Sequence, residues 1–178
     1  MKPQLHTPYH CAVPSLFQSG ESVTAGRVAL SRPALEAEAF PWLEAALAPE
    51  WSLAEFTAAA NLSEAVLISD TEGAAIGLAL VRPGMPSPGD ATIAFLAVQP
   101  ERRYRGLGGE AGLAVERLAR DRLGARRVYA GVPEGRGLAV YFWLRLGFRP
   151  LSIAEAPDAP LGLTPDSRPG IWMIRDSV

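Results

Sequence analysis

A strand, a glycine-rich turn and a helix in direct succession constrain this chain more than any other stretch. Residues 93–120 read IAFLAVQPERRYRGLGGEAGLAVERLAR, an apolar run followed by a turn that holds Arg102, Arg103 and Arg105. From Leu107 onward, apolar residues recur with the spacing of one helix face and charged residues fill the other positions. The segment therefore predicts a strand, a loop and an amphipathic helix in that order.

The start of that helix is suited to an anion. Backbone N–H groups in the first turn of a helix have no intrahelical partner, and the helix dipole adds positive charge there. Gly106, Gly108 and Gly109 lack a Cβ atom, so a phosphate can approach the backbone closely. Arg103 and Arg105 can neutralise its charge. By its chemistry alone, the segment predicts a phosphate at a helix start.

The order of residues in the loop resembles a known signature. Residues 98–108, VQPERRYRGLG, are similar to the V-x-P-x-x-R-G/x-x-G-x-G signature of the GCN5-related N-acetyltransferase (GNAT) superfamily, with matches at Arg103, Gly106 and Gly108. Residues 139–148, AVYFWLRLGF, resemble the family's A-x-x-F-Y-x-x-x-G-F segment. The resemblance implies an α/β (α+β) GNAT fold: a mixed, mostly antiparallel sheet of about six to seven strands, splayed at the cofactor site and flanked by about four helices.

The resemblance also implies acetyl-CoA as the acyl donor and assigns residues to it. The pyrophosphate would lie on Arg103, Tyr104, Arg105, Gly106, Leu107, Gly108 and Gly109. The pantetheine arm would pair with the strand that ends in Leu96, Ala97 and Val98, in the manner of an added β-strand. Arg136 stands where many members have an asparagine that contacts the pantetheine.

The expected general acid departs from the family pattern. Many members carry a tyrosine four residues before the Gly-Phe pair as a proposed acid, and this chain has Trp143 there. An indole N–H donates a hydrogen bond but is no proton donor at neutral pH. A thiol pKa near about 8.5 still makes the thiolate a tolerable leaving group. Tyr141 is the alternative acid, although it points about 200° round the helix from Trp143; Trp143 would then be a positioning group.

Neither the general base nor the acceptor is fixed by the sequence. The base could be a water chain or one of the carboxylates Glu50, Glu72, Asp90 and Glu134, although each of these is more typical of an ordinary solvated charge. Two short helices after the first strand would form part of the acceptor wall. Residues from them that could line it are Trp42, Glu50, Trp51 and Phe56, although aromatic residues at helical spacing are also typical of a core.

Three functional readings compete. The first is an enzyme that transfers the acetyl group from acetyl-CoA to a primary amine of a small molecule or protein, by direct attack in a ternary complex. The second is a non-catalytic acyl-CoA-binding sensor or interaction module with the same fold, favoured by Trp143 and the lack of an evident base and disfavoured by the intact loop. The third is a dinucleotide fingerprint, because residues 106–111 satisfy G-x-G-x-x-A; the expected acidic residue about 20 positions on is replaced by Arg126 and Arg127.

Composition sets the remaining bounds. The 178 residues suit one domain over 27–178 after an amino-terminal arm over 1–26, and the net charge of −2 gives no reason to expect nucleic acid. Cys11 is the only cysteine, and its spacing to His6 and His10 matches no zinc pattern, so no disulfide and no metal are expected. The absence of a signal-like or membrane-length apolar run predicts a cytoplasmic protein without membrane contact. A monomer and a homodimer both remain open.

Periodicity and turn residues predict the other elements. The predicted strands are 27–31, 65–69, 74–82, 91–98, 126–132, 148–153 and 170–175. The predicted helices are 35–47 with a break at Pro41, 52–60, the helix from Leu107, and one that ends at Leu146. Hairpin order makes the strands at 65–69, 74–82 and 91–98 antiparallel neighbours, whereas 91–98 and 126–132 should be parallel. Residues 154–169 would fold over the acceptor site or form a surface loop.

Overall fold

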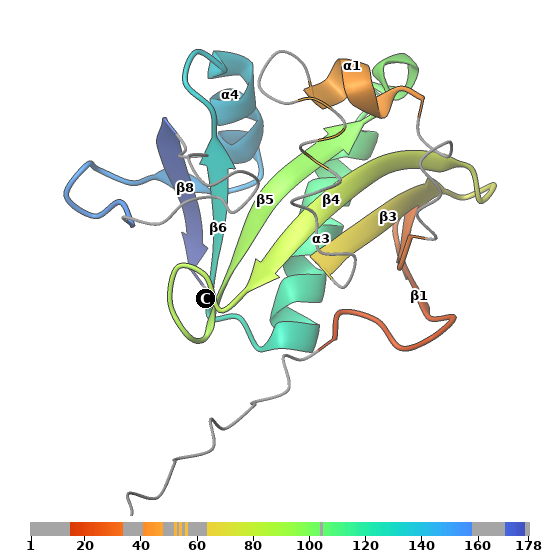
Figure 1. Cartoon of the computed structure of the whole chain (residues 1–178), viewed down its shortest axis with the longest axis horizontal. Coiled ribbons are helices and arrows are strands. Elements are labelled where there is room, and N and C mark those ends of the chain that lie inside the picture. The colour runs from red at the N-terminus through yellow and green to blue at the C-terminus, as the bar shows by residue number, and fades with distance from the viewer. Residues whose placement is uncertain are drawn as a thin grey trace, which may run out of the picture.

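One mixed sheet organises the molecule (Figure 1). The computed structural model describes residues 15–33, 41–47, 52, 54, 56, 64–103, 105–157 and 170–176. Within them, eight strands lie in the order β1-β2-β3-β4-β5-β6-β8-β7. The strands are β1 Ser22–Ala25, β2 Val28–Ser31, β3 Ala65–Asp70, β4 Ala75–Pro83, β5 Asp90–Val98, β6 Arg127–Val132, β7 Arg149–Pro150 and β8 Ile171–Asp176.

Helices cover both faces of this sheet. They are α1 Leu43–Leu47, α3 Leu107–Leu123 and α4 Gly137–Arg145, with a short 3-10 helix over Pro100–Arg102. The apolar stripe of α3 and Trp143 of α4 pack in one core cluster, whereas Leu43 and Leu47 of α1 pack in a second cluster. Because β4 and β5 are covered on both faces, their apolar residues run continuously instead of alternating with polar ones.

The centre of the sheet has the predicted pairing. Strands β3, β4 and β5 are antiparallel neighbours, and β5 pairs with β6 in parallel, which confirms the hairpin and crossover expectations. The β4–β5 register shifts at Ala94: Leu80 pairs with Phe95 and Val81 with Ile93. A bulge of this kind bends a strand and increases its twist.

The first strands of the sheet differ from the prediction. A hairpin of β1 and β2 replaces the single strand predicted at 27–31, and Leu16 and Phe17 are buried before it, so residues 15–26 belong to the folded domain instead of an arm. The sequence of β1, SVTA, alternates polar and apolar residues, and Val23 and Ala25 pack against the core, but four residues at a half-exposed sheet edge give only a short signal. Residues 1–14 lie outside the described residues.

The other differences are in length. Strand β7 covers only two residues of the predicted 148–153. Of the helix predicted over 35–47, the described part begins at Pro41 and becomes helical at Leu43. The Phe56 N–H donates to the Ser52 carbonyl at 3.1 Å, as a helix over 52–60 requires, but most of that segment lies outside the described residues. Among the helices that the structure describes, none is long and apolar enough to span a membrane.

Candidate active site

The carboxyl end of β5 is the starting point of the candidate site. Parallel pairing with β6 runs from Asp90↔Arg127 to Ile93↔Ala130 and stops there, next to the bulge at Ala94, while β4 stays paired with β5 up to Val98. Figure 1 shows β5 and β6 close together at one end and separated at the other, as the expected splay requires. The final residues Leu96, Ala97 and Val98 therefore have no β6 partner along one backbone edge.

The glycine loop lies directly after this strand end. Gly106 is the N-cap of α3 with φ of 82°, a left-handed conformation that favours glycine. The Gly109 and Glu110 N–H groups both donate to its carbonyl, at 3.0 and 3.2 Å. The N–H groups of Leu107 and Gly108 precede these first intrahelical bonds, so they are available to an anion.

Three arginines lie around the loop. Arg103 and Arg105 have exposed side chains, and the Arg103 Nε donates to the Val98 carbonyl at 3.2 Å, which ties the loop to the end of β5. The third is Arg27, which the sequence analysis did not single out; its Nη2 donates to the Arg105 carbonyl at 3.1 Å. No local signal could have found Arg27, since it is 78 positions away from its partner. Tyr104 lies outside the described residues.

Gly108 of the loop packs against its neighbours. A Cβ atom added there would be in ordinary contact with Phe142 at 3.7 Å and with Val98 at 3.9 Å. The N–H groups at the start of α3, the Arg103 and Arg105 side chains and the open edge of β5 lie at one end of the sheet, an arrangement that suits an anion joined to an extended amide chain.

Helix α4 closes the other side of the site. Phe142 of α4 and its C-cap residue Leu146 contact the positions where three glycines of α3 lack a Cβ atom, namely Gly108, Gly109 and Gly112. These glycines therefore have a packing role besides any contact with a phosphate. Arg136 is the N-cap residue of α4 and has an exposed side chain.

The two expected catalytic aromatics have opposite environments. Trp143 is 5% exposed, and its ring lies 5.0 Å from that of Phe142 and 4.8 Å from that of Phe148. Tyr141 is 59% exposed and its ring lies beneath the Arg145 guanidinium at 6.0 Å. The structure thus places Trp143 in the core under the site and Tyr141 on the outer face of α4.

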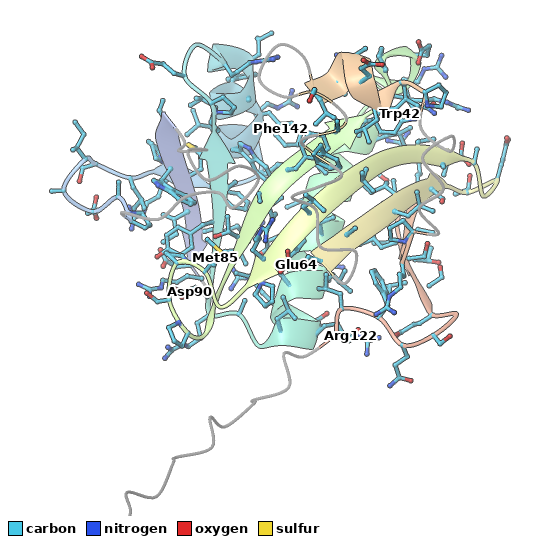
Figure 2. All side chains as sticks on the ribbon, in the orientation of Figure 1. Trp42, Glu64, Met85, Asp90, Arg122 and Phe142 are labelled. Atoms are coloured by element: carbon cyan, nitrogen blue, oxygen red, sulfur yellow. The ribbon has the colours of Figure 1, made fainter. Side chains whose placement is uncertain are left out.

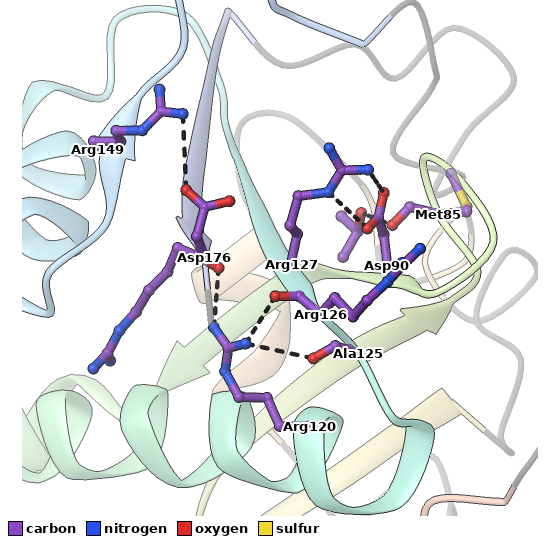
Figure 3. Close-up of polar contacts among 10 residues, drawn as sticks. Met85, Asp90, Arg120, Ala125, Arg126, Arg127, Arg149 and Asp176 are labelled. Atoms are coloured by element: carbon purple, nitrogen blue, oxygen red, sulfur yellow. Dashed lines mark hydrogen bonds and ion pairs between the residues drawn. The ribbon is translucent and has the colours of Figure 1, made fainter. Parts of the chain in front are cut away.

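The candidate bases are scattered. Asp90 is buried at the closed end of the β5–β6 pair, where both its oxygens accept hydrogen bonds from Arg127 at 2.9 Å (Figure 3). Glu72 is exposed in the β3–β4 turn and Glu134 is exposed after β6. Glu50 and Trp51 lie outside the described residues.

A further carboxylate, Glu64, was missed because its neighbours in sequence carry no motif. It pairs with Arg82 at 3.0 Å, and burial raises the pKa of the Glu64 carboxyl while Arg82 opposes that shift. Figure 2 shows Glu64 and Asp90 toward one end of the sheet and Phe142 toward the other. Neither carboxylate therefore lies at the splayed end.

The expected acceptor wall is described in part. Phe56 is buried with its ring 4.9 Å from that of Phe95 on β5, and Trp42 is half-buried against the same core cluster. Phe95 belongs to the strand that also carries the expected pantetheine edge, so this aromatic cluster lies on the α1 face of the sheet beside the site. Among the residues the structure describes, no group of three or more His, Cys, Asp and Glu side chains could hold a metal ion; His6, His10 and Cys11 are not among them.

Comparison with known proteins agrees with this geometry. A family model described as "Acetyltransferase (GNAT) family" matches residues 32–148. Among solved structures, an acetyltransferase from Agrobacterium tumefaciens is similar with a TM-score of 0.65 and 17% identity, over 90% of this chain and 97% of that one. A GNAT-family acetyltransferase from Elizabethkingia anophelis with acetyl-CoA bound has a TM-score of 0.58 and 15% identity, over 85% and 99%.

A third similar structure is the ribosomal-protein-S18-alanine N-acetyltransferase from Escherichia coli, with a TM-score of 0.53 and 20% identity over 83% of this chain and 90% of that one. At these identities the structures show a shared fold. No protein with a curated description matches the sequence.

Proposed function

The chain belongs to the acetyltransferase (GNAT) family, and on that premise we propose that it transfers the acetyl group of acetyl-CoA to a primary amine by direct attack in a ternary complex. The observation that carries this proposal is the position of two features at one end of the sheet. The unpaired edge of β5 beyond Ile93 meets the loop that begins α3 at Gly106. The first suits a pantetheine amide chain and the second suits a pyrophosphate.

The transfer balances without any further reactant. The amine nitrogen forms a bond to the thioester carbonyl carbon, the carbon–sulfur bond breaks, and the thiolate leaves with the bonding pair. The nitrogen loses its proton to water or a carboxylate, and the thiolate gains one from water. Backbone N–H groups near Val98 would stabilise charge that develops on the carbonyl oxygen, because the β5 edge has no β6 partner there.

Residues of this chain have separate parts in the proposal. Arg103, Arg105 and the first N–H groups of α3 bind the pyrophosphate, and Arg136 lies at the start of α4 toward the pantetheine. Trp143 is a positioning group, supported by its burial between Phe142 and Phe148. Departure of the thiolate then needs no protein acid, since a thiol pKa near about 8.5 makes it a tolerable leaving group.

Calorimetric titration with acetyl-CoA tests the proposal, followed by a free-thiol assay over a panel of amines. The panel includes small amines, amino acids, a lysine peptide and a peptide with amino-terminal alanine, because the E. coli neighbour is named for a protein alanine. Amine-dependent thiol release is the expected result. Binding of acetyl-CoA without thiol release in the presence of any amine would support the sensor function instead. That function is favoured by Trp143, because tryptophan has no hydroxyl group that could act as the general acid.

Gly108→Trp is the matched loss-of-function variant. The indole would occupy the space next to Phe142 and Val98, so acetyl-CoA affinity should fall at least about a hundredfold, corresponding to about 2.7 kcal/mol. Leu113→Trp adds the same ring on an exposed position of α3 and should bind like the wild type. Unchanged affinity in Gly108→Trp would show that the glycine loop does not hold the cofactor.

A further inference from the structure

The turn between β1 and β2 is fastened to the first turn of α3. The Arg27 Nε donates to Glu110 Oε1 at 2.7 Å. Its Nη2 donates to the same carboxylate oxygen at 2.5 Å and to the Arg105 carbonyl at 3.1 Å. The Arg27 backbone N–H donates to Glu110 Oε2 at 2.8 Å. We call this set, Arg27 with Glu110 and the Arg105 carbonyl, the Arg27 clamp.

The clamp is closely packed. A Cβ atom added at Gly26, whose φ is 62°, would come within 2.9 Å of Glu110 Oε2. One added at Gly106 would come within 3.1 Å of Arg27 Nη2. The two left-handed glycines therefore let the β1–β2 turn and the α3 N-cap approach each other, with the Arg27 guanidinium between them.

The clamp also neutralises the negative charge of Glu110 beside the loop. The Glu110 carboxylate lies in the first turn of α3, where the expected phosphate would bind, and two anions there would repel each other. Hydrogen bonds from the Arg27 side chain and backbone hold the carboxylate against Arg27 and lower the pKa of the Glu110 carboxyl. The pair then presents no net negative charge to a phosphate on the loop.

We propose that Arg27 is a positioning residue that fixes the glycine loop for the nucleotide half of acetyl-CoA. The proposal deepens the function above and rests on it. Arg27 acts through the Arg105 carbonyl and Glu110, 78 and 83 positions away in sequence. It therefore affects how the donor binds and not how the acetyl group moves.

Arg27→Ala tests this with two donors. Acetyl-CoA carries the nucleotide, whereas acetyl-pantetheine lacks it. We expect the KM for acetyl-CoA to rise about tenfold, corresponding to about 1.4 kcal/mol, with kcat within about threefold and with the KM for acetyl-pantetheine unchanged. A KM that rises equally for both donors would overturn the proposal, because it would indicate damage to the whole fold. A KM that rises for neither donor would overturn it as well.

Two further variants complete the design. Arg27→Lys keeps the charge but cannot bond Glu110 and the Arg105 carbonyl with a planar fork, so it should lie between Arg27→Ala and the wild type. This variant also supplies the answer if Arg27→Ala does not fold. Arg32→Ala removes an exposed arginine at the far end of β2 and should leave both KM values within twofold.

A third donor separates positioning from direct contact. With 3′-dephospho-acetyl-CoA, the effect of Arg27→Ala should persist, because the clamp acts on the loop. Loss of the effect with this donor would overturn the positioning role in favour of a direct contact with the 3′-phosphate. If the wild type does not bind acetyl-CoA, the proposed function itself is overturned. If the wild type binds acetyl-CoA and Arg27→Ala binds it equally well, only the role of Arg27 is overturned.

Discussion

Trp143 and Tyr141, the two residues predicted to act in catalysis, have opposite environments. The Trp143 indole packs between the rings of Phe142 and Phe148 in the core. A side chain held by two aromatic neighbours can fix the helix that faces the site. The Tyr141 phenol is instead exposed on the outer face of that helix, where the Arg145 guanidinium lies over its ring.

Phenylalanine substitutions at these two positions separate their roles. Trp143→Phe should keep kcat within about threefold and lower the free energy of unfolding by about 1–3 kcal/mol, because it removes buried ring atoms. Tyr141→Phe should leave both kcat and the free energy of unfolding nearly unchanged. The measurements are kcat, KM and urea unfolding, with Leu144→Ala, an exposed change on the same helix, as the control. A drop in kcat of about a hundredfold in Tyr141→Phe at unchanged stability would identify Tyr141 as the general acid.

At the scale of elements, the sequence predicts those helices, strands and turns that have a local residue pattern. The β3–β5 hairpins, the strand, loop and helix over residues 93–120, and the parallel β6 all carried an apolar run or a turn signal, and the structure confirms them. Strand β1 was missed because its alternation covers only four residues, whereas the contact of Arg27 with α3 joins segments 78 and 83 positions apart, which leaves no local pattern. The same reason explains why the packing of Phe142 on Gly112 could not be predicted from either helix alone.

The contact between β4 and the end of β5 supplies a prediction of its own. A Cβ atom at Gly77 would lie 2.7 Å from the Ala97 carbonyl oxygen, a backbone atom of the expected pantetheine edge, and 3.2 Å from Ile68. Gly77→Ala should therefore push β4 and β5 apart, lowering the free energy of unfolding by about 1–3 kcal/mol and weakening acetyl-CoA binding. Thermal unfolding and calorimetry measure the two effects.

Gly137→Ala is the control for that change. No atom lies within 4 Å of a Cβ atom there, at the first residue of α4, so the extra methyl should be neutral or stabilise by up to about 1 kcal/mol. Equal stability of the two variants would mean that β4 and β5 can accommodate a methyl group at Gly77 without cost. Lost stability with unchanged acetyl-CoA affinity would separate the β5 backbone from the cofactor site.

At the scale of the whole molecule, the sheet is held together at one end and open at the other. The closed end has the parallel pairs from Asp90 to Ile93 and the ion pair of the buried Asp90 with the exposed Arg127. Arg120 of α3 adds hydrogen bonds to the Ala125, Arg126 and Arg175 carbonyls, which join α3 to the start of β6 and the end of β8 (Figure 3). At the open end, β5 and β6 are linked through the packing of α4 on α3.

A ligand that bridges the open end should therefore stabilise the molecule as a unit. At a concentration about a hundredfold above its dissociation constant, acetyl-CoA should add about 2.7 kcal/mol, and for a chain of this size each kcal/mol raises Tm by about 2–4 °C. The expected shift is thus about 5–11 °C, with slowed amide exchange at the end of β5, the first turn of α3 and the start of α4. Gly108→Trp should show neither change. A ligand bound elsewhere could raise Tm equally, so the location of the protected amides decides whether acetyl-CoA lies in the opening. Protection confined to the β1 edge, with none in β5, would place the ligand outside the opening and contradict a bridging role.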